Sequence, residues 1–179
     1  KTNDMDFINE LLRNRRSIRR FKETKIENEK IESLKKAILM SPSGKRFNEW
    51  EFIFIDDKNI LDQLSYCKEH GSELLRNAPL GIVVIADKNK SDIVIEDCSI
   101  ASIIAQLAAE SIGLGSCWVQ CRLRKTTDGK DSEDVVREIL NIPDNYFVQS
   151  IIAIGYKDQD RKPFEDENLQ WEKIHTNTF

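Results

Sequence analysis

Histidine and cysteine are scarce in this sequence of 179 residues. The two histidines, His70 and His175, lie in polar stretches, so a Ser/His/Asp or Cys/His catalytic site would have to be assembled from poor candidates. The cysteines show no zinc-binding spacing. They are Cys67, Cys98, Cys117 and Cys121. We therefore expect neither a metal site nor a side-chain nucleophile, and we expect the cysteines to be small buried hydrophobic residues in a reducing compartment.

Long apolar runs are also missing. No stretch of the sequence is long and apolar enough to span a bilayer, and the N-terminus lacks the apolar core of a signal peptide. We therefore expect a cytoplasmic protein that has no membrane partner.

Glycine is infrequent, and no phosphate-binding loop is recognisable. A Walker-type loop is absent. The fragment Gly113-Leu114-Gly115 follows a predicted helix and lacks the third glycine of a dinucleotide-binding fingerprint, so we interpret it as a turn from a helix into a strand. If the protein is an enzyme, a bound organic cofactor must therefore carry the reaction.

The composition is that of one ordinary globular domain. Hydrophobic residues make up 40% of the chain and charged residues 32%. The length is sufficient for one well-buried core and too short for two. No repeat or shift in composition divides the chain. We expect a single domain over residues 1–179, in which the polar residues 157–179 form a C-terminal extension.

A cluster of basic residues stands out in a chain that is acidic overall. Between Arg13 and Lys25 there are seven basic residues and one acid, whereas the whole chain has 31 acids, 27 bases and a net charge of −4. This contrast indicates a local site for a small anion and argues against general attraction to nucleic acid. Guanidinium groups and the Ser17 hydroxyl suit phosphate oxygens. The alternative is a solvated charged face, which is the usual role of such a run.

Apolar periodicity predicts helices and strands that alternate along the chain. The expected helices are 4–14, 27–40, 56–67, 72–76, 97–112 and one that begins at Asp131 or Ser132. The expected strands are 50–55, 80–86, 115–119 and 147–156. Asn3 or Asp4 is expected to cap the first helix, and strand 50–55 is expected to be buried on both faces. This order predicts an α+β sandwich.

Several segments resemble motifs of the FMN-dependent nitroreductase family. The segment 15–21 (RRSIRRF) is similar to the first motif of that family, and later segments match in the same order. These later segments are 41–52, 97–118, 155–156 and 161–163. The likeness extends from about residue 7 to residue 165. It implies a three-layer α+β sandwich with a central, mainly antiparallel sheet flanked by helices.

The resemblance also implies a cofactor site that is shared between two subunits. Arg15, Ser17 and Arg161 would hold the FMN phosphate, and Arg19 would place a cation near flavin N1. Backbone groups after the third strand would meet the flavin edge, and segment 41–48 would reach the flavin of the other subunit. The cofactor-binding residues implied in this way are Arg15, Arg16, Ser17, Arg19, Pro42, Ser43, Gly44, Arg46, Asn48, Gln120, Cys121 and Arg161.

The sequence departs from the family pattern at several positions. Arg46, Asn48 and Glu49 stand where the family commonly has Asn, Gln and Pro, and Gln159 replaces a basic residue. Taken without the resemblance, segment 42–44 is a turn that ends a helix. Cys121 is either a redox-active thiol or a packed core thiol, and we favour the second interpretation.

The function implied by the resemblance is that of a homodimeric FMN oxidoreductase. NADH or NADPH would pass hydride through the flavin to a nitroaromatic, a quinone or an activated alkene, and no side chain would act as a nucleophile. One alternative is a flavin-binding protein that stores or senses FMN without turnover. Another is an anion-binding domain without flavin that binds the acidic surface of a partner protein. Specialised flavin chemistry ranks lower because no dedicated lid sequence is visible.

Overall fold

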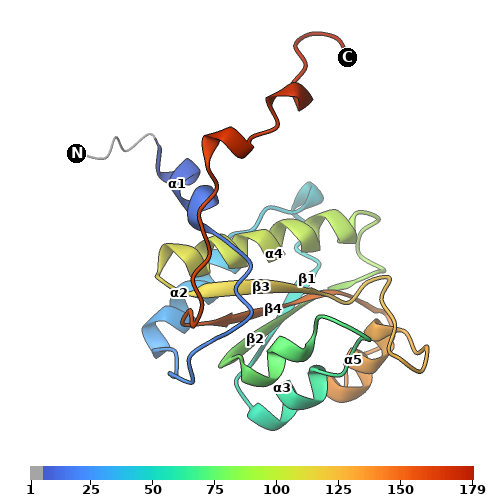
Figure 1. The fold of residues 1–179 in the computed structure, drawn as a ribbon. Coiled ribbons are helices and arrows are strands. Elements are labelled where there is room, and N and C mark those ends of the chain that lie inside the picture. The colour runs from blue at the N-terminus through green and yellow to red at the C-terminus, as the bar shows by residue number, and fades with distance from the viewer. Residues whose placement is uncertain (1–5) are drawn as a thin grey trace.

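The computed structural model describes residues 6–179, which form three layers (Figure 1). A four-stranded sheet lies in the middle, with α2 and α4 on one face and α3 and α5 on the other. The strands are β1 (Trp50–Ile55), β2 (Leu80–Asp87), β3 (Gly115–Gln120) and β4 (Tyr146–Gly155). The helices are α1 (Phe7–Asn14), α2 (Asn28–Leu39), α3 (Lys58–Leu64), α4 (Val94–Ser111) and α5 (Ser132–Leu140). Short 3-10 helices are η2 (Gly44–Arg46), η3 (Glu73–Asn77), η4 (Asp166–Asn168) and η5 (Trp171–Lys173).

The prediction of a mainly antiparallel sheet between helical layers is confirmed. The strand order is β1-β2-β4-β3, and every neighbouring pair is antiparallel. The two central strands are apolar on both faces because helices cover both sides of them. Val83 opposite Ile151 marks their register, which shifts once between Val84 and Ile85.

Strand β1 is not buried on both faces as expected. It lies at the edge of the sheet, where Glu51 is exposed and the residues Phe52, Ile53 and Phe54 are only half-buried. An apolar run cannot distinguish an edge strand from a central one, because edge position is set by long-range pairing.

Helix α4 packs across the sheet through small residues. Ala101, Ala105 and Ala109 are fully buried, so the helix backbone can approach the strands closely. The helix begins at Val94, three residues before the expected start, and ends at Ser111. Gly113 follows with a φ of +80°, a left-handed conformation that suits glycine at the end of a helix.

The ends of the expected helices differ in how they are capped. The carboxylate of Asp57 accepts hydrogen bonds from the backbone N–H groups of Asn59 and Ile60 at the start of α3. Asp131 precedes α5 without a capping hydrogen bond, because its carboxylate pairs with the Lys125 ammonium at 2.8 Å. The expected caps Asn3 and Asp4 lie outside the described residues, and α1 begins at Phe7.

The two terminal segments leave the body together, and the C-terminal extension then stands away from it (Figure 1). This extension contains η4 and η5, and several of its apolar side chains are exposed. They are Phe164, Leu169, Trp171, Ile174 and Phe179. Across the described part of the chain, no helix has the length and apolarity that crossing a membrane requires.

Candidate functional site

The basic segment 15–21 runs along the edge of the sheet beside β3. The Ile18 N–H donates to the Ser116 carbonyl oxygen at 2.9 Å, and the Lys22 N–H donates to the Tyr156 carbonyl oxygen at 2.9 Å. Ile18 and Phe21 are buried and anchor the segment in the core. Charged residues on either side of these two anchors are thereby left at the surface.

Two glycines make this close approach possible. A Cβ atom on Gly115 would lie 2.9 Å from Ile18 Cγ1, and one on Gly155 would lie 2.9 Å from Phe21 Cδ1. Both separations are shorter than ordinary van der Waals contact. The strands β3 and β4 therefore need glycine where the basic segment crosses their ends.

Gln159 joins the basic segment to the C-terminal segment. Its side-chain oxygen accepts hydrogen bonds from the backbone N–H groups of Arg19 at 2.8 Å and Arg20 at 2.9 Å. The Asp158 N–H donates to the Arg20 carbonyl oxygen at 3.0 Å. A lysine at position 159 could not accept these bonds, because an ammonium has no acceptor. This is a physical reason for the departure from the basic residue of the family pattern.

The same two segments surround a cavity of about 310 Å³ that contains Arg16 and Arg161 in its lining. The Arg16 guanidinium donates to the Lys162 carbonyl oxygen and lies 4.8 Å from the centre of the Phe164 ring. Lys157 and Glu110 also line the cavity and form an ion pair at 2.7 Å. Because Lys157 is neutralised by its partner, Arg16 and Arg161 supply the positive charge of this cavity, and Asp160 adds one negative charge to the lining.

Arg15, Ser17 and Arg19 do not line this cavity and lie close to the buried thiol of Cys117. Burial raises the pKa of this thiol, while the charges of Arg19 and Arg15 and a hydrogen bond to Ser17 act in the opposite direction. The half-buried Arg15 guanidinium forms no hydrogen bond or ion pair within residues 6–179. The structure therefore groups Arg15 with Arg19, and it is Arg16 that shares a cavity with Arg161.

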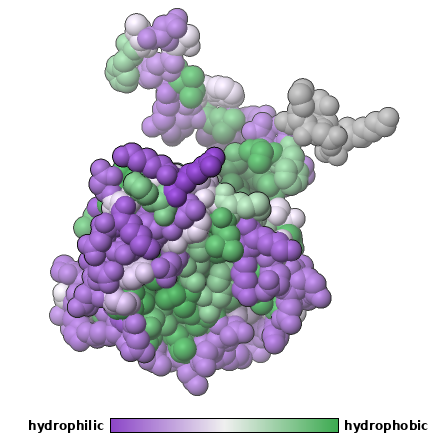
Figure 2. Space-filling model, turned by 180° about the vertical axis from the view of Figure 1, so that it is seen from behind, coloured by the Kyte–Doolittle hydropathy of each residue, from purple (hydrophilic) through white to green (hydrophobic). Residues whose placement is uncertain are grey.

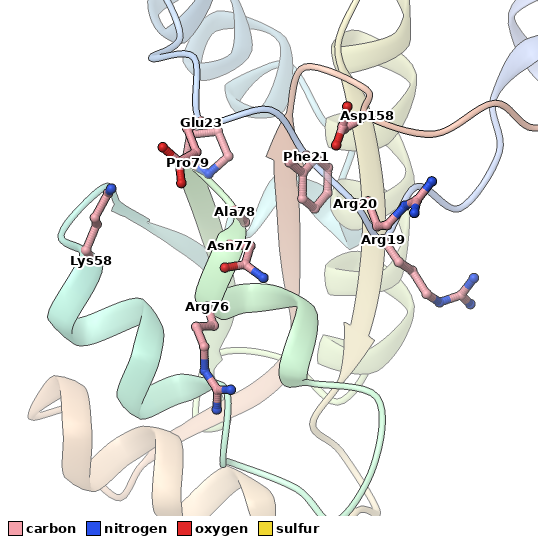
Figure 3. Close-up of a pocket in the computed structure, with 10 residues that line it drawn as sticks. All are labelled: Arg19, Arg20, Phe21, Glu23, Lys58, Arg76, Asn77, Ala78, Pro79 and Asp158. Atoms are coloured by element: carbon pink, nitrogen blue, oxygen red, sulfur yellow. The ribbon is translucent and has the colours of Figure 1, made fainter.

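A second cavity of about 250 Å³ is lined by Arg19 and Arg20 together with segment 76–79 (Figure 3). Lys58 and Arg76 also line it, but the four cationic side chains point in different directions. Arg76 is already paired with Asp62 at 2.9 Å. Because the charges do not converge, this cavity is a weaker candidate for an anion site than the one beside Arg161.

The segment 41–48, which is expected to contact the flavin, lies near the start of α4 at Asp97. The cavity of Arg16 and Arg161 lies near the other end of this helix, at Glu110. The Ser43 hydroxyl donates to Asn48 Oδ1 at 2.8 Å and accepts from the Asn48 N–H at 3.0 Å. The Gly44 N–H donates to both carboxylate oxygens of Asp97, at 3.0 and 3.2 Å. Pro42 is exposed in this loop. Three residues here are left-handed: Lys45, Arg46 and Asn48 have φ values of 51°, 59° and 48°.

The backbone of Cys121 is fully paired within the protein. Its N–H donates to the Gln149 carbonyl oxygen at 3.2 Å, and its carbonyl accepts from the Arg124 N–H at 3.1 Å. The N–H of Cys121 thus already has an acceptor inside the protein, and its expected contact with a cofactor edge stays a prediction. Its side chain is buried in the core beside Cys67, as expected for a packed thiol. The Gln120 side chain is also committed, because it bonds to Trp118 and to the Arg122 carbonyl oxygen.

Leu123 is a candidate that the sequence patterns did not reveal. It follows β3 closely, has a left-handed φ of 56°, and is 73% exposed although it is a large apolar residue. Its N–H makes no hydrogen bond within the described part of the chain. A backbone donor held in a strained conformation at a strand end is a feature of binding sites, and the left-handed φ of a leucine has no sequence signal.

Among residues 6–179, no group of three or more His, Cys, Asp and Glu side chains is placed to hold a metal ion.

The chain is similar to nitroreductases over nearly its whole length. The model of the nitroreductase family matches residues 12–66 and 63–156. An FMN-dependent nitroreductase from Clostridium difficile R20291 has a similar structure, with a TM-score of 0.93 and 46% identity over 94% of this chain and 98% of that one. A protein of Archaeoglobus fulgidus, provisionally named NADH dehydrogenase/NAD(P)H nitroreductase, is 34% identical over 90% of this chain and 92% of its own length. The motifs at both ends of the chain, the three-layer fold and these matches agree, and the chain belongs to the nitroreductase family.

Proposed function

We propose that the protein is an FMN-dependent oxidoreductase that takes hydride from NADH or NADPH and reduces a nitroaromatic, a quinone or a similar acceptor. The related structure from Clostridium difficile is described as FMN-dependent, and the archaeal relative carries an NAD(P)H nitroreductase name. Bound FMN would supply the redox chemistry, by accepting hydride from the nicotinamide and passing it to the acceptor.

The observation that carries this proposal is the cavity between the two terminal segments. Arg16 and Arg161 come from opposite ends of the chain and line it together. Guanidinium groups bind phosphate oxygens with paired hydrogen bonds, so these residues fit the phosphate of FMN. Phe164 packs against Arg16 and orients its guanidinium toward the Lys162 carbonyl.

The adjacent groups fit the polar edge of a flavin ring. Arg15 is half-buried and has no partner among residues 6–179, and Arg19 is its neighbour near Cys117. A cation there stabilises the negative charge that a reduced flavin carries. The unpaired N–H of Leu123 replaces Cys121 as the proposed backbone donor after β3. Pro42, Ser43, Gly44, Arg46 and Asn48 stay in the proposal as contacts from a second subunit.

The length of α4 supports a site that two subunits share. Segment 41–48 contacts this helix at Asp97, whereas the cavity of Arg16 and Arg161 contacts it at Glu110. These positions are thirteen residues apart, which is roughly 20 Å along a helix. Within one subunit a single FMN would have to extend over this distance, from its phosphate at Arg16 and Arg161 to its ring at segment 41–48. A homodimer can instead place segment 41–48 of the second copy beside the ring.

Exposed apolar surface also supports a homodimer. Figure 2 shows an apolar area in the middle of the rear face of the body and further apolar patches on the terminal segments. The exposed side chains on the body include Leu39, Met40, Phe47, Ile95 and Ile100. Surface of this kind is usually covered by a partner, and the apolar C-terminal extension of a second copy is our proposed cover.

One absorbance experiment tests the proposed activity. Purified protein, with FMN added if necessary, should show the yellow flavin spectrum, should bleach when NADH or NADPH is added, and should recolour with a quinone or a nitroaromatic. Retention of FMN without bleaching would support a storage or sensing role. Protein that remains colourless after incubation with FMN would contradict any flavin function.

A further inference from the structure

Two carboxyl groups lie together in the interior at the base of segment 41–48. Glu49 is fully buried, and Asp97 on α4 is 3% exposed. Neither carboxylate oxygen of Glu49 has a hydrogen-bond donor in the structure. Asp97 accepts from the Gly44 N–H with both of its oxygens. A buried charged oxygen without a donor is costly, and this cost favours the protonated form of the Glu49 carboxyl group.

The charges around this pair contain no compensating cation. No lysine, arginine or histidine within residues 6–179 forms an ion pair with Glu49 or Asp97. The other facing groups are the Ser91 hydroxyl and the Cys98 thiol. Burial first, and then the charges of Glu49 and Asp97, raise the pKa of Cys98 to about 12, so it stays neutral. Burial is also the largest cause that raises the pKa of Glu49, and Asp97 adds to it, while the backbone N–H of Glu49 and the Ser91 hydroxyl act in the opposite direction.

We propose that Glu49 and Asp97 share one proton, and that this carboxylic acid–carboxylate pair positions segment 41–48. Two carboxylates in contact inside a protein cannot both be ionised at low cost. With one proton between them, Glu49 donates to Asp97, whose oxygens accept the hydrogen bond of the Gly44 N–H. Glu49 and Asp97 are positioning residues, since they act through the loop and have no assigned contact with a ligand.

The loop needs such an anchor because its backbone is strained. Lys45, Arg46 and Asn48 are all left-handed, a conformation that is unfavourable for residues other than glycine and least so for asparagine. The Gly44–Asp97 bond and the Ser43–Asn48 pair help to hold this conformation, together with backbone hydrogen bonds from the Arg46 and Phe47 N–H groups. The effect on cofactor binding rests on the proposed function, in which this loop contacts the FMN of the second subunit. The shared proton itself does not rest on it.

The first experiment measures the proton without using FMN. Full-length wild type and Glu49→Gln are unfolded with urea across a pH series that starts below 4.5, the ordinary pKa of Glu49. Because the folded pKa of Glu49 is raised, the folded state holds a proton that the unfolded state has lost. The unfolding equilibrium constant of the wild type should therefore rise relative to Glu49→Gln as the pH increases from 4.5 to the folded pKa, by about tenfold for each pH unit.

A neighbouring residue provides the control. Glu96 precedes Asp97 on α4 and is exposed, so Glu96→Gln removes one acid from the same helical turn without touching the pair. It should keep the pH dependence of the wild type. Asp97→Asn should weaken this dependence without abolishing it, because burial still raises the pKa of Glu49 when the contribution of Asp97 is gone. Equal pH dependence in the wild type and Glu49→Gln would overturn the shared proton. So would a difference that appears only when Na⁺, Mg²⁺ or Ca²⁺ is added, since a cation would then hold the pair.

The second experiment tests positioning, by titrating FMN and following its fluorescence at each pH. At low pH the wild type and Glu49→Gln should have the same FMN dissociation constant. Above the folded pKa of Glu49, the dissociation constant of the wild type should be about tenfold larger than that of Glu49→Gln. The phosphate of FMN titrates equally in both proteins, so it does not affect this ratio. If the ratio of the two dissociation constants does not change with pH while the unfolding constants do diverge, the positioning role is overturned and the shared proton is not. If neither the wild type nor any variant binds FMN, the proposed function is contradicted. The urea experiment then still tests whether Glu49 and Asp97 share a proton.

Discussion

The side-chain oxygen of Gln159 lies 2.8 Å from the backbone nitrogen of Arg19 and accepts its hydrogen bond. The same oxygen accepts from the Arg20 N–H, so one amide of the C-terminal segment fixes two consecutive residues of the N-terminal basic segment. The two ends of the chain are thus joined by a polar contact beside the cavity that contains Arg16 and Arg161.

Removing this acceptor should loosen the basic segment and weaken FMN binding. For Gln159→Leu we expect a loss of about 1–3 kcal/mol in binding free energy, from two hydrogen bonds of about 0.5–1.5 kcal/mol each. The wild type is the reference, because Gln159→Glu would keep the acceptor but would add a negative charge to the lining of the proposed phosphate site. The measurement is the FMN dissociation constant by fluorescence quenching. Equal affinities for the wild type and Gln159→Leu would show that the acceptor has no role in holding the segment.

Arg15 is expected to contribute to FMN binding through its unpartnered guanidinium. Arg15→Ala should weaken binding by about 1.5–3 kcal/mol, the range for a hydrogen bond to a charged group. Lys25→Ala removes an exposed cation of the same basic cluster and should change binding much less. Isothermal titration with FMN measures both. Unchanged flavin retention in Arg15→Ala would remove this residue from the proposed site.

Most of the fold follows from local patterns in the sequence. The apolar runs of β2 and β4 and the helical spacing around Ala101 and Ala105 depend on neighbours in the chain, so periodicity locates them. The edge position of β1 cannot be read from local patterns, because it depends on pairing between distant segments. The early start of α4 at Val94 likewise has no strong cap signal, since Ile93 precedes it without a capping side chain.

The candidate site was less accessible to prediction than the fold. The motif placed Arg15 and Arg161 together, whereas the structure groups Arg16 with Arg161 around the cavity. Neighbouring arginines in an irregular segment point to different sides, and sequence does not show which. Cys121 was expected to offer a backbone group, but its pairing with Gln149 is a long-range contact. No sequence pattern predicts the left-handed conformation of Leu123.

Removing the C-terminal extension should dissociate the proposed dimer and release FMN. A chain that ends after Pro163 lacks the exposed apolar residues Trp171, Ile174 and Phe179, along with Phe164, which packs on Arg16. Trp171→Asp with Ile174→Asp keeps Phe164 and separates the two effects. Light scattering and the bound-flavin ratio measure the outcome. A full-length monomer that retains FMN would contradict the shared site.

The loop between α2 and β1 should respond in opposite directions to two changes at adjacent positions. Lys45 has a φ of 51°, so Lys45→Gly relieves left-handed strain of about 1–2 kcal/mol and loses about 0.5–1 kcal/mol through backbone entropy. Its free energy of unfolding should rise slightly. Gly44→Ala should lower it by about 1 kcal/mol or more, because the new Cβ would lie 2.2 Å from Ile93 Cδ1.

A second substitution identifies the cause of the loss at Gly44. Valine at position 93 lacks the Cδ1 atom that the new methyl group would meet, so Ile93→Val combined with Gly44→Ala should recover most of the lost stability. Ile93→Val alone should cost about 0.5–1.5 kcal/mol. Urea unfolding of the four proteins gives the coupling energy between the two positions. Strictly additive effects would mean that the stability lost in Gly44→Ala does not come from the contact with Ile93. The loss would then arise elsewhere, for example in the Gly44–Asp97 hydrogen bond.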